Sequence, residues 1–365
     1  MKALVVGGTG PTGHFIVNGL LQRGYCVAIL HRGKHEVAEI PPEVEHIHTD
    51  PNFRENLDVA LEGRTFDLCI ASYGRLKLVA AAMVGKTDRF IALGASSYRG
   101  ILGPEFTYPQ GEPVPIAEHR PSTPKVEENK LSYLVAAAEK AVLDLHPEAT
   151  YFRIPPFPYG PYQVMPREWL IIRRLLDKRP FILLPDGGLS LYSHGYAANL
   201  AQGVLLAVDE PEISAGQSYN CADEEQLTLR QIVEVIADTM GRSIEIKSIP
   251  LGIANLTKPL VLQNTTGHTV LDLYKIKAEL GYRDLVPSVA AIARTTQWLL
   301  ENPVEPGSHM ETMLGDPFDY AQEDLLADRH DRLVSAMDDF AYHDSVKVHP
   351  YAHPKERGRE DHYGR

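Results

Sequence analysis

Cysteine is scarce in this sequence of 365 residues, which contains three, Cys26, Cys69 and Cys221. They lie far apart in apolar stretches and form no Cys-x-x-Cys pair. We therefore expect reduced, buried thiols, with neither a disulfide framework nor a structural metal site. Long apolar runs are also missing, since none approaches the roughly 18 to 20 residues of a membrane-spanning helix. The sequence thus predicts no transmembrane segment and no membrane partner.

Positive charge is in deficit, because 36 lysines and arginines face 48 aspartates and glutamates, for a formal net charge of −12. This charge opposes the counterion release that drives non-specific nucleic-acid binding, so we expect no nucleic-acid partner. The N-terminal sequence MKALVVGG lacks the apolar segment and cleavage site of a secretory signal. A cytoplasmic protein with a small-molecule substrate is the expectation that follows.

Short apolar runs alternate with helical patterns over the first 150 residues. A helix is predicted from Thr12 to Arg23, ended by Gly24. The apolar runs have the composition of strands that are buried on both faces of a sheet, and they lie at 2–6, 26–30, 44–48, 67–71, 90–93 and 150–153. This alternation predicts an α/β fold with a doubly wound parallel sheet of the Rossmann type.

A glycine-rich turn, Gly7-Gly8-Thr9-Gly10-Pro11-Thr12-Gly13, connects the first strand to the first helix. In such a turn the first glycine permits a tight bend, and the second lets backbone N–H groups approach a pyrophosphate. The third lets the helix pack closely on the strand, and the N–H groups at the helix start face the phosphates. We therefore predict a dinucleotide site formed by Gly7, Thr9, Gly10, Pro11, Thr12 and Gly13.

The second strand ends in His31-Arg32-Gly33-Lys34-His35, with no acidic residue before Glu36. An NAD-selective site usually has an acid here for the ribose 2′-hydroxyl, whereas Arg or Lys pairs with a 2′-phosphate. Arg32 and Lys34 therefore favour NADP, with NAD as the alternative. Asp50, after the third strand, is placed either to accept from the adenine amino group or to cap the next helix.

The later part of the chain indicates a second lobe and a tail. We expect a long loop over 100–124, a Rossmann domain over 1–160 to which later segments return, and a substrate lobe over 161–302. Helices are predicted at 167–176, 227–241, 272–281 and 288–300. The acidic, histidine-rich tail, 303–365, contains one amphipathic helix, with Leu326, Leu333, Met337 and Phe340 on one face.

Several stretches carry a family resemblance: the glycine turn, Asp50, LGASSYRG (93–100), RIPPFPYGP (153–161), NLAQGV (199–204), YNCADEEQLTLRQIVEVIADTMG (219–241) and DLYKIKAELGY (272–282). Together they make residues 1 to about 302 resemble the extended short-chain dehydrogenase/reductases, in the NAD-dependent epimerase/dehydratase branch. The resemblance implies a cofactor lobe and a lobe that shapes a pocket for nucleotide-sugars or small ketones. It also implies that Ser72, Tyr73, Gly74, Pro155, Pro156 and Phe157 contact the cofactor.

The same resemblance implies catalysis by a serine at the end of the fifth strand and by a Tyr-x-x-x-Lys pair on the next helix. The lysine's charge would stabilise the tyrosine phenolate. Ser96, in preference to Ser97, and Tyr133 match the serine and the tyrosine, and the lysine position is then Ala137. If instead Glu139 is aligned with the glutamate that often follows the pair, the two positions become Leu131 and Val135. Either alignment breaks the pair, so Tyr98, Tyr73, Lys130 and His194 are further candidates.

Three functions remain open. The leading one is an atypical extended reductase, in which NADPH reduces a small carbonyl or an activated double bond and Ser96 with Tyr133 polarises the acceptor oxygen. A nucleotide-sugar epimerase or dehydratase is the second, although the missing lysine counts against it. The third is a catalytically inactive regulatory protein that binds NADP. The resemblance also implies a homodimer through the 126–145 helix.

Overall fold

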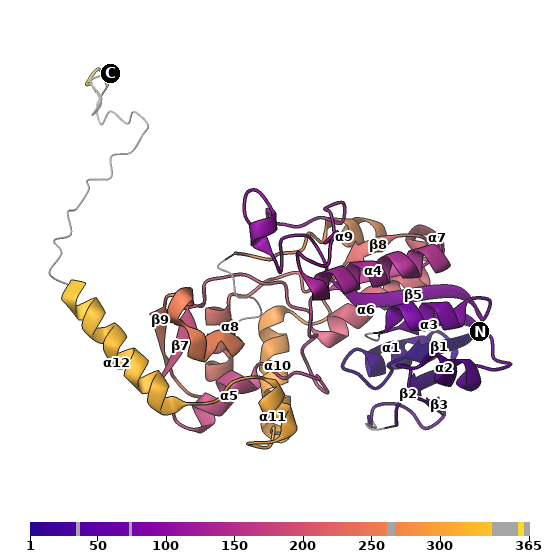
Figure 1. Ribbon diagram of the computed structural model, residues 1–365, viewed down its shortest axis with the longest axis horizontal. Helices are drawn as coiled ribbons and strands as arrows, with labels where there is room; N and C mark the ends of the chain where they lie inside the picture. Colours follow the sequence, from indigo (N-terminus) through magenta and orange to yellow (C-terminus); the bar gives the residue numbers. More distant parts are fainter. Residues whose placement is uncertain (34–36, 73–74, 261–266, 338–356, 361–365) are drawn as a thin grey trace. The chain divides into compact units, whose positions relative to one another are not determined.

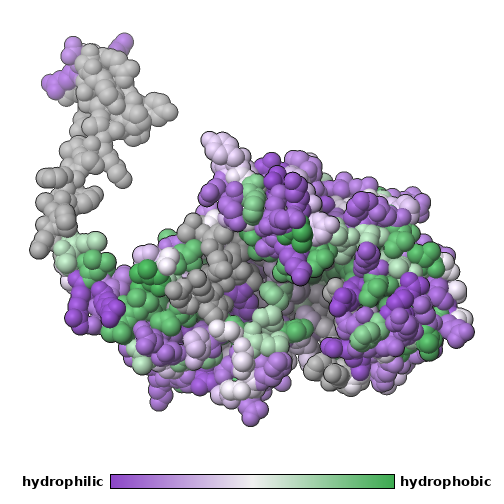
Figure 2. All heavy atoms as spheres, in the orientation of Figure 1, coloured by the Kyte–Doolittle hydropathy of each residue, from purple (hydrophilic) through white to green (hydrophobic). Residues whose placement is uncertain are grey.

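The computed structural model describes residues 1–33, 37–72, 75–260, 267–337 and 357–360. The chain divides into two units, Met1–Asp319 and Tyr320–Arg365, and each is described here by itself. Within the described residues, no helix combines the length and the apolar composition needed to cross a membrane. Hydrophobic and hydrophilic residues are interspersed over the face drawn in Figure 2.

Seven parallel strands form the main sheet, in the order β3-β2-β1-β4-β5-β6-β8. They are β1 (Lys2–Val6), β2 (Cys26–His31), β3 (Glu45–His48), β4 (Phe66–Ala71), β5 (Thr87–Ala95), β6 (Thr150–Ile154) and β8 (Ser218–Asn220). The central strands are nearly all apolar because helices cover both faces of the sheet. The predicted doubly wound parallel sheet is confirmed, and every predicted run forms a strand.

Helices pack on both faces of this sheet (Figure 1). One face is covered by α1 (Gly13–Gln22) and α6 (Ala197–Asp209), and the other by α2 (Arg54–Ala60), α3 (Leu76–Met83) and α4 (Lys130–Leu145). Two smaller helices, α7 (Pro211–Ser214) and α9 (Tyr274–Leu280), flank β8 and α6. Because α6 and β8 come from beyond residue 160, the sheet takes in chain from the region expected to form the substrate lobe.

A second hydrophobic core holds the smaller lobe together. It is built from α5 (Trp169–Leu176), α8 (Leu229–Thr239), α10 (Ser288–Glu301) and a two-stranded parallel sheet of β7 (Phe181–Pro185) and β9 (Glu245–Ile249). Thr228 and Gln231 form a capping box that starts α8, which lies within the helix predicted over 227–241. The sequence pattern indicated the helices of this lobe but neither of its strands.

The tail starts later than the sequence indicated. Residues 303–319, including α11 (His309–Met313), belong to the first unit because buried polar contacts join them to α5. Trp169 Nε1 donates to Glu311 Oε1 at 3.0 Å, and Arg174 pairs with Asp316 at 2.9 Å. The boundary therefore lies at 319/320 and not at 303. The predicted tail helix is α12 (Tyr320–Met337), and Phe340 lies outside the described residues.

Candidate functional site

The glycine turn has the backbone geometry that a phosphate-binding turn requires. Gly7 has a φ of 89°, a conformation that side chains disfavour, and its N–H donates to Leu30 O of β2 at 3.0 Å. A Cβ on Gly13 would lie 2.1 Å from Gly8 O, so only glycine lets α1 start so close to the turn. A Cβ on Gly10 would meet only Gly7 O, at 3.5 Å, and this side of the turn is open. The turn therefore fits a dinucleotide pyrophosphate.

The residues expected to select the cofactor lie at the ends of β2 and β3. Arg32 is exposed directly after β2, whereas Lys34 lies outside the described residues. Asp50 Oδ1 accepts from the N–H and the side-chain amide of Asn52, at 3.0 and 2.8 Å. These bonds organise the turn before α2, but the N-cap of this helix is Phe53 and no side chain caps it, so the expected capping role of Asp50 is wrong.

The ends of β4 and β5 carry the next group of predicted residues. Ser72 N–H donates to Val6 O at 3.0 Å, which ties the end of β4 to β1, while Tyr73 and Gly74 lie outside the described residues. Ser96 is half-buried directly after β5, and its N–H donates to Ile154 O of β6 at 2.9 Å. Ser97 is buried, and within the described chain its hydroxyl has no hydrogen-bond partner.

Helix α4 turns Ser132, and not Tyr133, toward the buried end of β5. Ser132 Oγ lies 3.3 Å from Ser97 O and 2.7 Å from Thr123 Oγ1, so this helix start is fixed by hydroxyl contacts. Tyr133 is half-buried, and its hydroxyl forms no hydrogen bond with another described residue. No hydrogen bond joins Tyr133 to Ser96 within that part of the chain.

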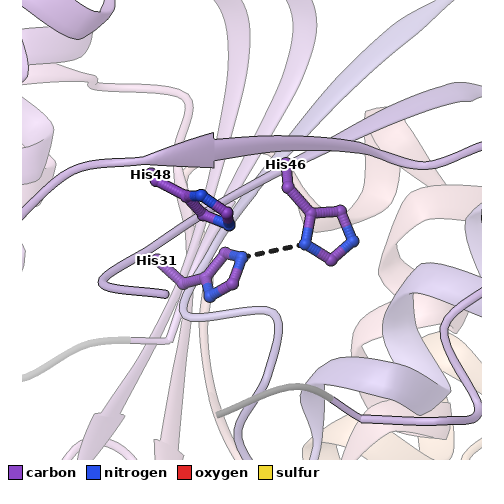
Figure 3. Close-up of side chains that lie close together, drawn as sticks. All are labelled: His31, His46 and His48. Atoms are coloured by element: carbon purple, nitrogen blue, oxygen red, sulfur yellow. Dashed lines mark hydrogen bonds between the residues drawn. The ribbon is translucent and has the colours of Figure 1, made fainter. Parts of the chain in front are cut away.

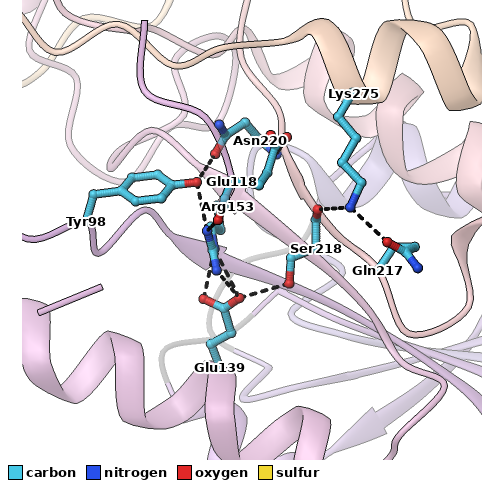
Figure 4. Close-up of polar contacts among 8 residues, drawn as sticks. All are labelled: Tyr98, Glu118, Glu139, Arg153, Gln217, Ser218, Asn220 and Lys275. Carbon is cyan, nitrogen blue, oxygen red and sulfur yellow. Dashed lines mark hydrogen bonds and ion pairs between the residues drawn. The ribbon is translucent and has the colours of Figure 1, made fainter. Parts of the chain in front are cut away.

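A cluster of polar side chains around Arg153 of β6 connects α4 to the sheet (Figure 4). We call Tyr98, Glu118, Glu139, Arg153, Ser218 and Asn220 the Arg153 cluster. Arg153 pairs with Glu139 of α4 at 2.9 Å, and its Nη1 donates to Tyr98 Oη and to Glu118 O, both at 2.8 Å. Tyr98 Oη in turn donates to Asn220 Oδ1 at 2.6 Å, and burial raises the pKa of Tyr98 to about 12. Tyr98, one of the further candidates for catalysis, is thus a structural residue of this cluster.

A pocket lies behind the Pro155–Pro156–Phe157 turn that follows β6. Phe157 is 48% exposed and lines the pocket. Its backbone φ of 62° is a strained conformation for a residue with a side chain. Pro156 also lines the pocket, whereas Pro155 is buried. The remaining lining combines apolar side chains with several polar ones, namely Tyr159, Gln163, Arg167, Glu168, Tyr192 and His194. We call this space the His194 pocket.

Burial shifts the charge state of the polar groups in the His194 pocket. Burial, with a smaller contribution from the Arg167 charge, lowers the pKa of His194 to about 4, and burial lowers the pKa of Arg167 to about 10. It raises the pKa of Glu168, whose Oε2 accepts from Gln163 Nε2 at 3.0 Å. His194 Nδ1 is buried and has no partner within the described residues. A neutral imidazole with an unused nitrogen suits a ligand that donates or accepts a hydrogen bond there.

Behind the pocket wall, Asp223 holds Tyr159 and the start of α6 in place. Tyr159 Oη donates to Asp223 Oδ2 at 2.7 Å, and Asp223 Oδ1 accepts from Tyr196 N and Asn199 Nδ2, both at 2.9 Å. Burial raises the pKa of Asp223 to about 7. Sequence reasoning named His194 but missed Arg167, Glu168 and Asp223. For Arg167 and Glu168, the available clue was that two charged residues stand next to each other directly before the apolar helix α5.

No family model matches the chain. Among curated proteins it is 27% identical over 140 residues to the uncharacterized protein YbjS of Escherichia coli, covering 33% of this chain and 42% of YbjS. It is 26% identical over 256 residues to y4nL of Sinorhizobium fredii, covering 64% of this chain and 68% of y4nL. It is 23% identical over 267 residues to the mitochondrial NADH dehydrogenase [ubiquinone] 1 alpha subcomplex subunit 9 of Arabidopsis thaliana, covering 69% of this chain and 61% of that protein.

Solved structures resemble this fold over most of its length. The dTDP-glucose 4,6-dehydratase DesIV of Streptomyces venezuelae, with NAD and TYD bound, has a TM-score of 0.64 at 20% identity, covering 83% of this chain and 98% of DesIV. The UDP-glucuronic acid 4-epimerase of Bacillus cereus, in complex with NAD, has a TM-score of 0.64 at 17% identity, covering 83% and 99%. The expected resemblance to extended short-chain dehydrogenase/reductases is therefore confirmed at the level of the fold.

Proposed function

Because the chain has the fold of the extended short-chain dehydrogenase/reductases, we propose that it is an NADP-dependent oxidoreductase that reduces a small carbonyl or an activated double bond. The observation that carries the proposal is the glycine turn, where Gly13 packs on Gly8 and the Gly10 side stays open. The bound cofactor would supply the hydride. The chain's own residues orient the cofactor and the substrate and exclude water from the pocket.

Selection of NADP rests on Arg32, which is exposed after β2 in a segment with no acid before Glu36. Fluorescence titration is expected to show tighter binding of NADPH than of NADH. Arg32→Ala should weaken NADPH binding by about tenfold, because a charge-assisted hydrogen bond is lost, and leave NADH binding unchanged. Arg283→Ala, at a 66% exposed guanidinium that follows α9, is the matched control. Equal or tighter binding of NADH by the parent protein would contradict the NADP assignment.

The proton donor and the oxygen-binding group are assigned to Tyr133 and Ser96. The alternative alignment on Glu139 puts Leu131 and Val135 at the tyrosine and lysine positions. In that alignment the pocket must polarise the acceptor oxygen, and the neutral imidazole of His194 is the candidate hydrogen-bond donor. Oxidation of NADPH by a panel of aldehydes, ketones and enones tests the activity. Ser96→Ala, Tyr133→Phe and His194→Gln separate the donors, with the 77% exposed Tyr274 changed to Phe as a control.

Two other functions give different results in the same assay. Turnover of a nucleotide-sugar without net change in the cofactor would favour an epimerase or dehydratase, the class to which the compared solved structures belong. Tight NADPH binding without any turnover, unaffected by Ser96→Ala and Tyr133→Phe, would favour the inactive NADP-binding protein. The similarity to an NADH dehydrogenase subunit is a reason to test for the inactive NADP-binding protein.

A cytoplasmic homodimer through α4 completes the proposal. Leu131, Leu134 and Leu145 of this helix are 65%, 53% and 40% exposed, and burial between two copies would remove their apolar surface from water. Light scattering of the purified protein is expected to give twice the chain mass. Leu134→Glu should give the monomer, whereas Leu285→Glu, at a 59% exposed leucine away from α4, should not.

A further inference from the structure

Three histidines lie on one face of the sheet at its β3 edge. His31 ends β2, and the parallel register pairs it with His48, the last residue of β3. His46 lies two residues earlier on β3, and side chains at this spacing point to the same face of a strand. Figure 3 shows the three rings turned toward one another. The backbone therefore dictates this juxtaposition.

The ring nitrogens are close enough to share one ligand. One nitrogen from each of the three rings lies within 4.8 Å of the others, and His31 Nε2 is 3.1 Å from His46 Nδ1. A tetrahedral ion bonded to nitrogen at about 2.0–2.1 Å holds its ligand atoms roughly 3.3 Å apart. Small rotations of the side chains would bring the three nitrogens to that spacing. His31 is buried, His46 is half-buried and His48 is exposed, so an ion could enter from the solvent side.

We propose that His31, His46 and His48 bind one divalent metal ion of the zinc class, with the remaining coordination position open to water. Three neutral imidazoles suit zinc, nickel and copper better than magnesium or calcium, which prefer oxygen ligands. The acidic chain, with a formal net charge of −12, favours accumulation of cations near the protein. The site does not depend on the proposed reductase activity.

Ion binding rearranges one proton without releasing it from His31. Gly33 N–H donates to His31 Nδ1 at 3.3 Å, which leaves the ring proton on Nε2, between His31 and His46. When the ion occupies Nε2, this proton moves to Nδ1 and the long bond from Gly33 is lost. His46 contributes the Nδ1 lone pair that now accepts from His31. Each imidazole must be unprotonated to bind the ion.

The sequence expectation of no structural metal site rested on the cysteines, and it overlooked this group. The clue was the spacing His-x-His in a strand, at 46 and 48, beside a strand that ends in histidine. A two-residue period puts both rings on one side, but only the register of β3 against β2 brings His31 to them.

The test is titration of the metal-free full chain with Zn²⁺ by calorimetry and with Co²⁺ by visible absorption. The parent protein is expected to bind one ion at this site with the absorption bands of tetrahedral Co²⁺. His46→Ala with His48→Ala should weaken this binding by at least about tenfold. His48→Ala alone changes only an exposed ring, so it should weaken binding while the circular dichroism spectrum stays that of the parent.

The tail supplies the matched control, because His349 and His353 are two of the 15 histidines of the chain and are not among the three proposed ligands. His349→Ala with His353→Ala should retain the ion at parental affinity. The proposal is overturned if the His48 and His46/His48 variants bind Zn²⁺ as the parent does. It is equally overturned if only the His349/His353 variant loses the ion, or if the parent binds none at millimolar Zn²⁺.

Discussion

The Arg153 cluster and the His194 pocket are both buried and polar, but they differ in how completely their atoms are paired. In the Arg153 cluster every buried side-chain nitrogen and oxygen has a partner within the described residues (Figure 4). In the His194 pocket, His194 Nδ1 has none, and burial moves the pKa values of His194, Arg167 and Glu168 away from their usual ranges. The Arg153 cluster holds strands and helices together, whereas the His194 pocket has a nitrogen atom that could form a hydrogen bond with a ligand.

This difference separates two consequences of mutation. A fully paired cluster loses stability when one member is removed, because its neighbours stay buried without a partner. A substitution in a pocket whose polar atoms lack partners should change the free energy of unfolding little and the affinity for a ligand strongly. The following substitutions test that division, and they are ordered by the expected change in the free energy of unfolding.

Glu139→Gln should give the largest loss. The Arg153 side chain is 12% exposed and that of Glu139 is 7% exposed, so removing the carboxylate charge leaves a buried guanidinium without its counter-ion. We expect a loss of about 3–5 kcal/mol, measured from urea denaturation. Asp144→Asn, in the same helix, removes an acid that is 59% exposed and pairs with Lys140, and it should change stability by less than about 1 kcal/mol. Equal effects of the two substitutions would refute the distinction between the cluster and the surface.

Tyr98→Phe should cost less, about 1–3 kcal/mol. The variant keeps the ring but leaves Asn220 Oδ1 without its donor and Arg153 Nη1 with one acceptor fewer. Because the site assignment makes Tyr98 structural, turnover per folded molecule should stay at the parental value. Tyr108→Phe, at a fully exposed ring, is the control for urea denaturation. A stable variant with strongly reduced turnover would return Tyr98 to the list of catalytic candidates.

The sequence was sufficient for features that arise from local geometry. The glycine turn, strands β1 to β6 and helix α8 depend on residues that are close in the chain, so spacing alone predicted them. The His194 pocket gathers residues from the loop after β6, from the start of α5 and from 192–194, and nothing in their spacing indicates that they meet. The same limit applies to β7 and β9, whose pairing spans more than sixty positions of chain between Phe181 and Glu245.

Asp223 stands between the two regions, because it is bonded to Tyr159 of the pocket and its N–H donates to His194 O at 2.9 Å. Burial raises its folded-state pKa to about 7, so the folded protein holds a proton that the unfolded chain, with a pKa of about 3.9, releases. Stability from this group is therefore present at low pH and is lost as the pH rises from about 4 to 7.

Asp223→Asn should flatten this dependence by about 1 kcal/mol per pH unit, since the amide stays neutral and can still accept from Tyr196 N and Asn199 Nδ2. Urea midpoints at pH 5, 6, 7 and 8 measure the slope. Asp58→Asn, at a carboxylate that is 49% exposed, should leave the parental slope intact. A slope that is the same in all three proteins would show that Asp223 is ionised in the fold throughout this range.

His194→Gln should have the smallest effect on stability at pH 7.5, below about 1 kcal/mol, because the imidazole is neutral there and its Nδ1 loses no partner. The pH dependence is opposite in sign to that of Asp223. With a folded pKa of about 4 against about 6.5 when unfolded, His194 costs the parent protein stability as the pH falls through that window, and the variant escapes this loss. Binding should respond more strongly, with a weaker affinity for whichever carbonyl substrate the NADPH assay identifies. If the variant instead unfolds as readily as Glu139→Gln while its substrate affinity stays at the parental value, the His194 pocket is a structural cluster like that of Arg153.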